Sequence, residues 1–167
     1  NGVGKMECSD VVYLLGFLFA QGPSPVALGE RFTDHGDGTV TDGSSGLMWC
    51  QDTCDVNGDG SVTAADMVSR TDAAAVVRTL HLGGYDDWRL PLTPELFSLV
   101  DPARENPCIA PVFGVVPGDY WIARTNAGAP CHGSTFGVEF MGGFLSVKGA
   151  YDSSCCGYVR AVRGRQP

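Results

Sequence analysis

Runs of apolar residues divide the chain into an N-terminal arm and a main domain. Residues 11–20 form a continuous run in which β-branched and aromatic side chains surround Gly16, a composition that favours a strand over a helix. Both faces of this strand are apolar, which is typical of a buried strand. Its large apolar side chains are Val11, Val12, Tyr13, Leu14, Leu15, Phe17, Leu18 and Phe19. A helix needs about 20 apolar residues to span a bilayer, so this shorter run predicts no membrane span.

Residues 21–25 read Gln-Gly-Pro-Ser-Pro and predict a stiff, extended linker after the strand. We therefore expect residues 1–29 to form the arm and residues 30–167 to form one domain. The apolar strand has two possible placements. It folds back onto its own domain, or it inserts into a neighbouring subunit as in donor-strand complementation. The second placement predicts a homo-oligomer, and a head-to-tail exchange that does not close predicts a filament.

The pattern of the main domain predicts a hairpin and two helices. Asp37-Gly38 lies between two strand-like segments and indicates a hairpin turn. Thr71-Asp72 opens a helix that runs through Leu80 and ends before Gly83-Gly84. A second helix has Thr93 as its cap and Pro94 at its first position.

Short apolar stretches separated by glycines predict a small, twisted antiparallel sheet in the second half of the domain. Its strands are expected at residues 120–123, 137–141, 144–148 and 158–162. Arg89 stands between two apolar residues and is expected to pair with a carboxylate inside the domain. Three tryptophans are predicted to anchor the core rather than to form a surface for stacking sugars: Trp49, Trp88 and Trp121.

Residues 55–66 read Asp-Val-Asn-Gly-Asp-Gly-Ser-Val-Thr-Ala-Ala-Asp, which is the pattern of a calcium-binding loop. Such a loop has oxygen ligands at its first, third, fifth and last places, a backbone carbonyl at the seventh and glycine at the sixth. Gly60 supplies the turn, and Thr63 is placed to hold a water. The predicted ligands of Ca²⁺ are Asp55, Asn57, Asp59, the carbonyl of Ser61, and Asp66. An Asp/Gly-rich surface turn without metal is the alternative interpretation.

The cysteines indicate a secreted protein. There are seven of them, their spacing matches no standard zinc site, and disulfides in an oxidising compartment explain them better. Cys50 and Cys54 flank the start of the loop and are placed to close it. The adjacent pair Cys155-Cys156 must reach two different partners, for which Cys131 and Cys108 are candidates. The odd number leaves one thiol over, and we expect it to be Cys8. The disulfide candidates are therefore Cys8, Cys50, Cys54, Cys108, Cys131, Cys155 and Cys156.

The net charge of −8 argues against a nucleic-acid partner, because such a chain has little positive charge to neutralise phosphates. An enzyme is not expected either, since none of the three histidines lies in a recognisable nucleophile–base motif. These residues are His35, His81 and His132.

An ordered series of motifs runs through the main domain, from about residue 30 to residue 164. The motifs are Arg31–Asp42, Gly46–Trp49, Leu82–Pro91, Glu95–Asp101, Tyr120-Trp121 and Tyr158–Arg163. The series resembles the C-terminal domain family of bacterial collagen-like adhesins, a family described as a domain of unknown function. The resemblance implies a C-type-lectin-like fold in a secreted or surface protein, and glycan adhesion in at least one branch. It implies no catalytic residues.

The calcium loop also resembles one repeat of a type I dockerin. Dockerins carry two repeats, and they often have Ser-Thr at the tenth and eleventh places to bind cohesin. This chain has one such loop, with Ala64 and Ala65 at those places, so recognition of cohesin is not expected. We interpret the loop as a structural insertion at residues 54–67.

These expectations combine into one hypothesis. The chain is an α+β, loop-rich, disulfide-bonded and C-type-lectin-like domain with an extended N-terminal strand arm. It is expected to be a non-enzymatic structural subunit of an extracellular bacterial assembly. The apolar strand would join the subunits, and Ca²⁺ and disulfides would stabilise them. The alternative is a secreted glycan-binding adhesion module, although the Glu-Pro-Asn and Trp-Asn-Asp motifs of calcium-dependent lectins are absent.

Overall fold

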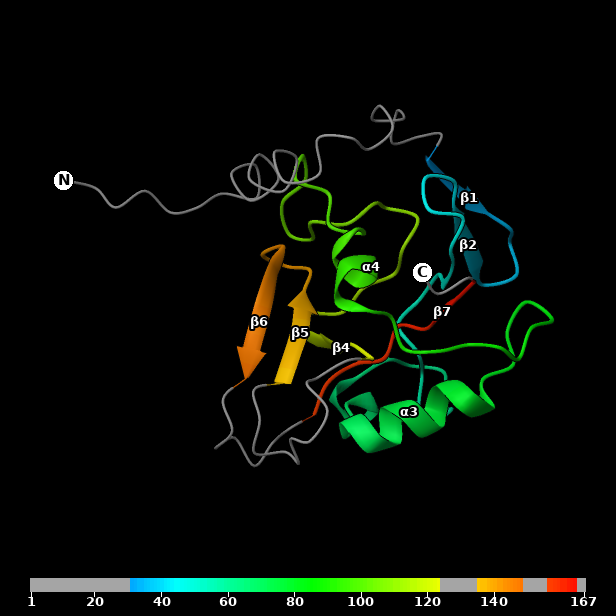
Figure 1. The fold of residues 1–167 in the computed structure, drawn as a ribbon. Coiled ribbons are helices and arrows are strands. Elements are labelled where there is room, and N and C mark those ends of the chain that lie inside the picture. Colours follow the sequence, from blue (N-terminus) through cyan, green and yellow to red (C-terminus); the bar gives the residue numbers. More distant parts are fainter. Residues whose placement is uncertain (1–30, 124–134, 149–155, 165–167) are drawn as a thin grey trace.

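The computed structural model describes residues 31–123, 135–148 and 156–164 as an α+β arrangement of two small antiparallel sheets with helices beside them (Figure 1). This confirms the α+β class. The predicted arm, including the apolar strand at residues 11–20, lies outside the described residues. Cys8, Cys131 and Cys155 also lie outside them. None of the helices in the described ranges is long and apolar enough to cross a membrane.

The first sheet has the strand order β1-β2-β3-β7. Its strands are β1 (Phe32–Asp34), β2 (Thr39–Asp42), β3 (Met48–Cys50) and β7 (Val162–Arg163). The predicted hairpin at Asp37-Gly38 joins β1 to β2. Asp37 accepts the backbone N–H of Thr39 at 3.0 Å, and Gly38 has a φ of +83°, which favours glycine at this turn.

The second sheet has the order β4-β5-β6, with β4 (Asp119–Trp121), β5 (Thr135–Glu139) and β6 (Phe144–Lys148). The prediction that residues 158–162 add a fourth strand to this sheet is wrong. Tyr158 forms a parallel bridge with Tyr120, but Val162 pairs with Trp49 of the first sheet. The segment from Gly157 to Val162 therefore connects the two sheets, and it is buried along its whole length.

Within the described ranges, two α-helices accompany the sheets: α3 (Arg70–Thr79) and α4 (Thr93–Phe97). The hydroxyl of Ser69 accepts the N–H of Asp72 at 3.2 Å and caps α3, so the helix begins one residue before the predicted start. The prediction of Thr93 as the cap of α4 is also wrong. The carboxylate of Glu95 accepts the N–H of Leu92 at 2.7 Å, and Leu92 is the capping residue.

The apolar core has two parts. One lies between the sheets and α4, and the other lies under α3, which crosses the lower side of the view in Figure 1. The three tryptophans are buried in these clusters, with exposed fractions of 0%, 4% and 5% for Trp49, Trp88 and Trp121. This confirms their predicted role as core anchors and excludes them as a stacking surface for sugars.

Two arginine–carboxylate pairs hold loops onto this core. Arg89 contacts both carboxylate oxygens of Glu95 at 2.7 Å, which confirms the pairing predicted for Arg89. Arg31 contacts Asp42 at 2.9 and 2.7 Å, and the side chain of Asp42 is fully buried. Burial by itself raises the pKa of Asp42, but hydrogen bonds from Arg31 and Ser44 outweigh it and lower that pKa.

We expect Asp42→Asn to lower the free energy of unfolding by about 2 kcal/mol at pH 7, because it removes charge-assisted hydrogen bonds from a buried carboxylate. Asp87→Asn is the matched control. Asp87 pairs with Arg163 at 2.6 Å, but its side chain is 57% exposed, so the loss should be below about 1 kcal/mol. Urea denaturation measures both, and equal losses would contradict the prediction.

The same pair predicts a pH dependence. The pKa of Asp42 is lower in the folded state, so its stabilising effect is complete above the unfolded value of about 4. It is lost as the pH falls through the folded pKa. The difference in stability between the wild type and Asp42→Asn should therefore narrow in acid, and a difference that grows in acid would refute this assignment.

Candidate metal centre

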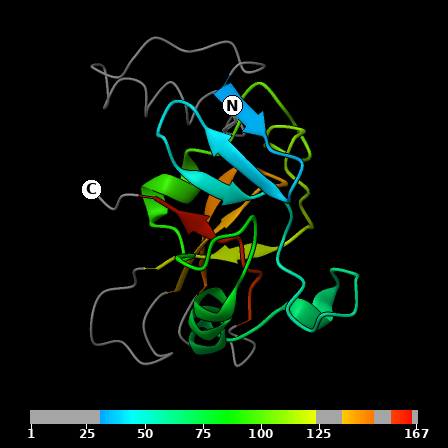
Figure 2. The ribbon, with the colours of Figure 1, turned by 90° about the vertical axis from the view of Figure 1, so that its right-hand side faces the viewer.

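The predicted calcium loop, residues 55–66, is held at both ends by one buried segment. Before the loop, Cys54 donates its backbone N–H to the carbonyl of Val159 at 2.9 Å. After the loop, Val68 and Gly157 exchange two backbone hydrogen bonds of 3.1 and 3.0 Å. Figure 2 shows the loop standing out from the body of the domain beside α3. The loop is also attached to the core by side chains, because Val62 packs against one core cluster and Val56 against the other.

Asp55, the first predicted ligand, organises the turn. Its two carboxylate oxygens accept the N–H groups of Gly58 at 2.8 Å and Gly60 at 2.7 Å. Both glycines have positive φ, +74° and +86°, which side-chain-bearing residues rarely adopt. Gly60 thus lies at the turn where the motif requires glycine.

Asn57 and Asp59 continue the same bonding pattern. The side-chain oxygen of Asn57 accepts the N–H of Asp59 at 2.9 Å, and Asp59 accepts the N–H of Ser61 at 2.9 Å. The amide of Asn57 donates to the second oxygen of Asp59 at 3.1 Å. These Asx turns keep the side chains folded over their own loop rather than extended into solvent.

Asp66, the last predicted ligand, joins the two ends of the loop. Its carboxylate accepts the N–H groups of Val56 at 2.9 Å, Asn57 at 3.2 Å and Thr63 at 2.8 Å. Asp66 has no exposed surface, although the loop that encloses it lies at the surface of the domain. The hydrogen bond from Thr63, followed by those from Asn57 and Val56, lowers the pKa of Asp66. The carboxylate is therefore held in its charged form.

The 3₁₀-helix η1 (Ala64–Asp66) ends the loop. Thr63, predicted to hold a water, instead caps this helix, since its hydroxyl accepts the N–H of Ala65 at 3.2 Å. Together with the hydrogen bond from Thr63 to Asp66, this makes a capping box. The position of Asp66 is consequently fixed by local structure.

Asp66 is held close to the start of the loop, because its carboxylate accepts the N–H of Val56, the residue after Asp55, at 2.9 Å. Two neighbouring carboxylates repel when both are charged, and a divalent cation between them would reverse the sign of the interaction. The other candidate ligands are the side chains of Asn57 and Asp59 and the carbonyl of Ser61. An all-oxygen set of this kind suits Ca²⁺ or Mg²⁺ rather than the softer transition metals.

No group of three His, Cys, Asp or Glu side chains in the described ranges is arranged to hold a metal ion. The three carboxylates of the candidate centre, Asp55, Asp59 and Asp66, are therefore not gathered into one ligand group in this structure. The structure places Asp55 and Asp66 at the two ends of one loop, and it places Asn57, Asp59 and Ser61 in consecutive turns between them.

Two buried cysteines lie directly before the loop. Cys50 and Cys54 are 3% and 9% exposed, and both are free thiols. The thiol of Cys50 hydrogen-bonds to the sulfur of Cys54, which raises the pKa of Cys50 and lowers that of Cys54. Cys156 is also a free thiol. The predicted disulfide framework is therefore not formed among these three residues.

Sequence analysis missed Arg160, whose side chain is fully buried. It donates to the carbonyls of Cys50 at 2.9 Å and Gln51 at 2.7 Å, and also to the carbonyl of Gly114. The available signal was its position in an apolar stretch, Tyr158–Val162, where a single charged residue needs a specific set of acceptors.

The comparisons with known proteins agree with the motif series. No curated protein matches the chain. The family model of the Lcl C-terminal domain matches residues 38–163, which include the candidate metal loop, both α-helices and all the described strands except β1. Because this match covers well over half of the 167 residues, the chain belongs to the Lcl C-terminal domain family.

Proposed function

We propose that this chain is a non-enzymatic structural module of an extracellular bacterial assembly, and that Ca²⁺ bound at residues 55–66 stabilises it. The observation that supports the calcium part is that Asp55 and Asp66 organise the same loop: Asp55 binds the N–H groups of Gly58 and Gly60, and Asp66 binds that of Val56, the residue after Asp55. A cation bound between the two carboxylates would offset the repulsion of their charges. It also fixes the loop between its two anchors on the Gly157–Val159 segment.

A secreted location fits this site. Calcium loops of extracellular modules have dissociation constants of about 10⁻⁴–10⁻³ M, so they fill at millimolar calcium outside the cell. The net charge of −8 and the seven cysteines are in keeping with such a protein. We also propose that the fold is C-type-lectin-like, which the pairing of the last described strand, β7, with β3 of the first sheet supports.

The assembly part of the proposal rests on the apolar strand at residues 11–20. Burying its eight large side chains at ~1.5–3 kcal/mol each gives a gross gain on the order of 15 kcal/mol, which the ordering of the arm partly offsets. Within the described residues, the outer strands are β1 and β7 in the first sheet and β4 and β6 in the second, and single bridges to Arg89 and Tyr158 partly cover β7 and β4. Outer strands present backbone N–H and C=O groups that an inserted strand from another subunit can pair with.

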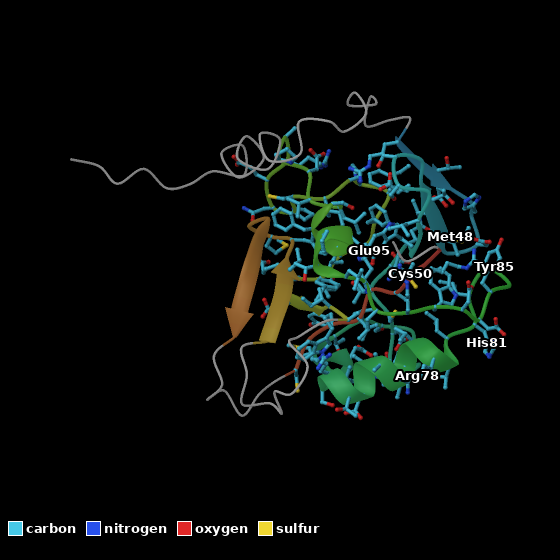
Figure 3. The ribbon with its side chains drawn as sticks, in the orientation of Figure 1. Met48, Cys50, Arg78, His81, Tyr85 and Glu95 are labelled. Atoms are coloured by element: carbon cyan, nitrogen blue, oxygen red, sulfur yellow. The ribbon has the colours of Figure 1, made fainter. Side chains whose placement is uncertain are left out.

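A glycan-binding module is the second candidate, and Tyr85 is the observation that favours it. Tyr85 is the large hydrophobic residue that is exposed among those described, at 38%, and Figure 3 shows it at the periphery of the domain. The guanidinium of Arg163 lies 3.6 Å from the centre of its ring, which holds the ring in place. A fixed aromatic ring at the surface is a suitable stacking partner for a neutral sugar, whereas the acidic surface disfavours sulfated glycans.

Removing calcium should lower the melting temperature of the chain. For calcium at 100 times its dissociation constant, the lost stabilisation is about 2.7 kcal/mol. This corresponds to roughly 5–10 °C for a domain of this size. Thermal unfolding followed by circular dichroism, with and without EDTA, measures it.

Asp59→Ala should melt at a lower temperature in calcium and should show no further loss on adding EDTA. Asp86→Ala is the control, because Asp86 is exposed and lies outside the loop, so its calcium-dependent shift should match that of the wild type. A wild-type melt that EDTA leaves unchanged would mean that the loop does not bind calcium.

Deletion of residues 1–22 should convert the assembled protein into a monomer, because it removes the apolar strand. Size-exclusion chromatography with light scattering, together with negative-stain microscopy, compares the two forms. Calcium-dependent melting of the truncated chain reports whether its domain remains folded. Oligomers of the same size in both forms would reject the assembly role of the arm.

If the glycan-binding candidate is correct, a glycan array should show binding to neutral sugars. Tyr85→Ala should abolish that binding, and Tyr85→Phe should keep most of it because the ring face remains. Absence of binding across the array, with and without calcium, would eliminate this candidate.

A further inference from the structure

We propose that Cys50 and Cys54 form a thiol–disulfide site, and that its oxidation strengthens calcium binding by fixing the residue before the first ligand. The calcium part of this inference rests on the proposed function, whereas the disulfide part does not. The site is internal: both sulfurs belong to the core cluster under α3, and Figure 3 shows Cys50 between α3 and the first sheet.

Backbone hydrogen bonds attach the two cysteines to neighbouring places on one buried segment. Cys50 donates its N–H to the carbonyl of Ala161 at 3.0 Å, and Cys54 donates to that of Val159 at 2.9 Å. Val159 and Ala161 are two residues apart, so these acceptors are separated by at most about 7 Å. A disulfide requires Cα atoms about 4.4–6.8 Å apart. The side chains of both cysteines belong to the same buried cluster, and each thiol shifts the pKa of the other.

The residues between the two cysteines are held in place by the core. Arg160 donates to the carbonyls of Cys50 and Gln51, and Gly114 donates to the carbonyl of Gln51 at 3.1 Å. Thr53 is buried, and its hydroxyl shares a 2.7 Å hydrogen bond with the hydroxyl of Tyr120. Since this short connection is already ordered, forming the S–S bond requires little further loss of chain entropy.

The reaction is an exchange with a disulfide of the surroundings, of the class of oxidised glutathione. One cysteine, as thiolate, attacks a sulfur of the reagent, forming a mixed disulfide and releasing one reagent thiolate. The second cysteine, as thiolate, then attacks the first cysteine's sulfur, forming the Cys50–Cys54 bond and releasing the second reagent thiolate. The two cysteine protons end on the two released thiolates. Two thiols are oxidised, and one reagent disulfide is reduced to two thiols.

The link to calcium is the peptide bond between Cys54 and Asp55. The Asp55 carboxylate binds the N–H groups of Gly58 and Gly60, so the position of the turn follows the position of Asp55. In the reduced chain Cys54 is attached to the core by its hydrogen bond to Val159, which can open when the loop moves. A disulfide adds a covalent attachment that prevents this opening, and less entropy is then lost when calcium orders the ligands. By linkage, calcium must make the disulfide harder to reduce by the same factor, which we expect to be about fivefold or more.

The disulfide can be tested on the full 167-residue chain, because trypsin cuts after Arg31 and Arg70 and leaves one peptide, residues 32–70, that contains Cys50 and Cys54 and no other cysteine. The chain is equilibrated in glutathione buffers, blocked with N-ethylmaleimide, digested and weighed by mass spectrometry. The oxidised peptide should be lighter than the unblocked reduced peptide by two hydrogens and should carry no maleimide. A peptide that carries two maleimides in oxidised glutathione would overturn the disulfide site.

Isothermal titration with Ca²⁺ on the oxidised and the reduced full chain tests the coupling. The oxidised form should bind about fivefold or more tightly. The Cys50→Ser/Cys54→Ser variant should bind like the reduced form in both buffers, and Cys156→Ser should keep the wild-type difference. Equal affinities of oxidised and reduced wild type would overturn the coupling. No calcium binding in either state, with the disulfide formed, would instead overturn the proposed function of the loop.

Discussion

The buried guanidinium of Arg160 is the contact on which the packing of this domain depends. Moving a cation out of water costs several kcal/mol unless hydrogen bonds replace those of water. Here the acceptors are backbone carbonyls from the end of β3 and from Gly114, and the faces of Phe113 and Tyr120 lie 5.4 and 5.6 Å away. These segments are far apart in sequence, so Arg160 is accommodated only when they have come together. Its burial thereby favours one arrangement of the core over looser ones.

The segment that carries Arg160 also explains how the metal loop is attached. Gly157 and Val159 bind the residues on either side of the loop, and Val162 pairs with both β3 and Arg89. The loop therefore closes across a fixed gap, and most of the entropy of bringing its ends together has been lost when the core forms. A cation would then need to order only the candidate ligands within residues 55–66. Calcium at the proposed site would therefore act mainly on the loop and its ligands rather than on the formation of the core.

Local signals were sufficient for part of this structure. The hairpin at Asp37-Gly38 and the burial of the tryptophans follow from turn chemistry and side-chain size, so sequence predicted both. The two helix caps were missed for different reasons. Ser69 caps α3 through a local hydrogen bond with Asp72, and it competed in the sequence with Thr71 as a capping residue, whereas the start of α4 also depends on Arg89. Thr93 was expected to cap α4. Instead, the carboxylate of Glu95, which Arg89 holds in place, accepts the N–H of Leu92, and the helix is capped one residue earlier.

The sheet topology was missed for a different reason. The sequence of residues 158–162 predicts a strand, and it was expected to pair with the strands predicted before it, at residues 120–148. The structure instead encloses consecutive residues on all sides, including Arg160, and leads them from one sheet to the other. Alternation of apolar and polar residues predicts a strand with one buried and one exposed face, so it cannot reveal a segment that is buried on all sides. In the loop, the spacing of the oxygens was visible in the sequence, but the capping role of Thr63 was not, because a hydroxyl at that place serves either purpose.

The two ends of the metal loop are fixed by different kinds of structure, and this difference determines how the site can respond. Asp66 is placed by a capping box with Thr63, which involves only neighbouring residues. Asp55 is placed by Cys54, whose backbone is bound to Val159 in the core. A cation that contacts both carboxylates would have to bring Asp66, which neighbouring residues hold, close to Asp55, which the core holds through Cys54. The affinity of the proposed site would therefore depend on how firmly the core holds Cys54, because Cys54 is joined to the first proposed ligand, Asp55, by a single peptide bond.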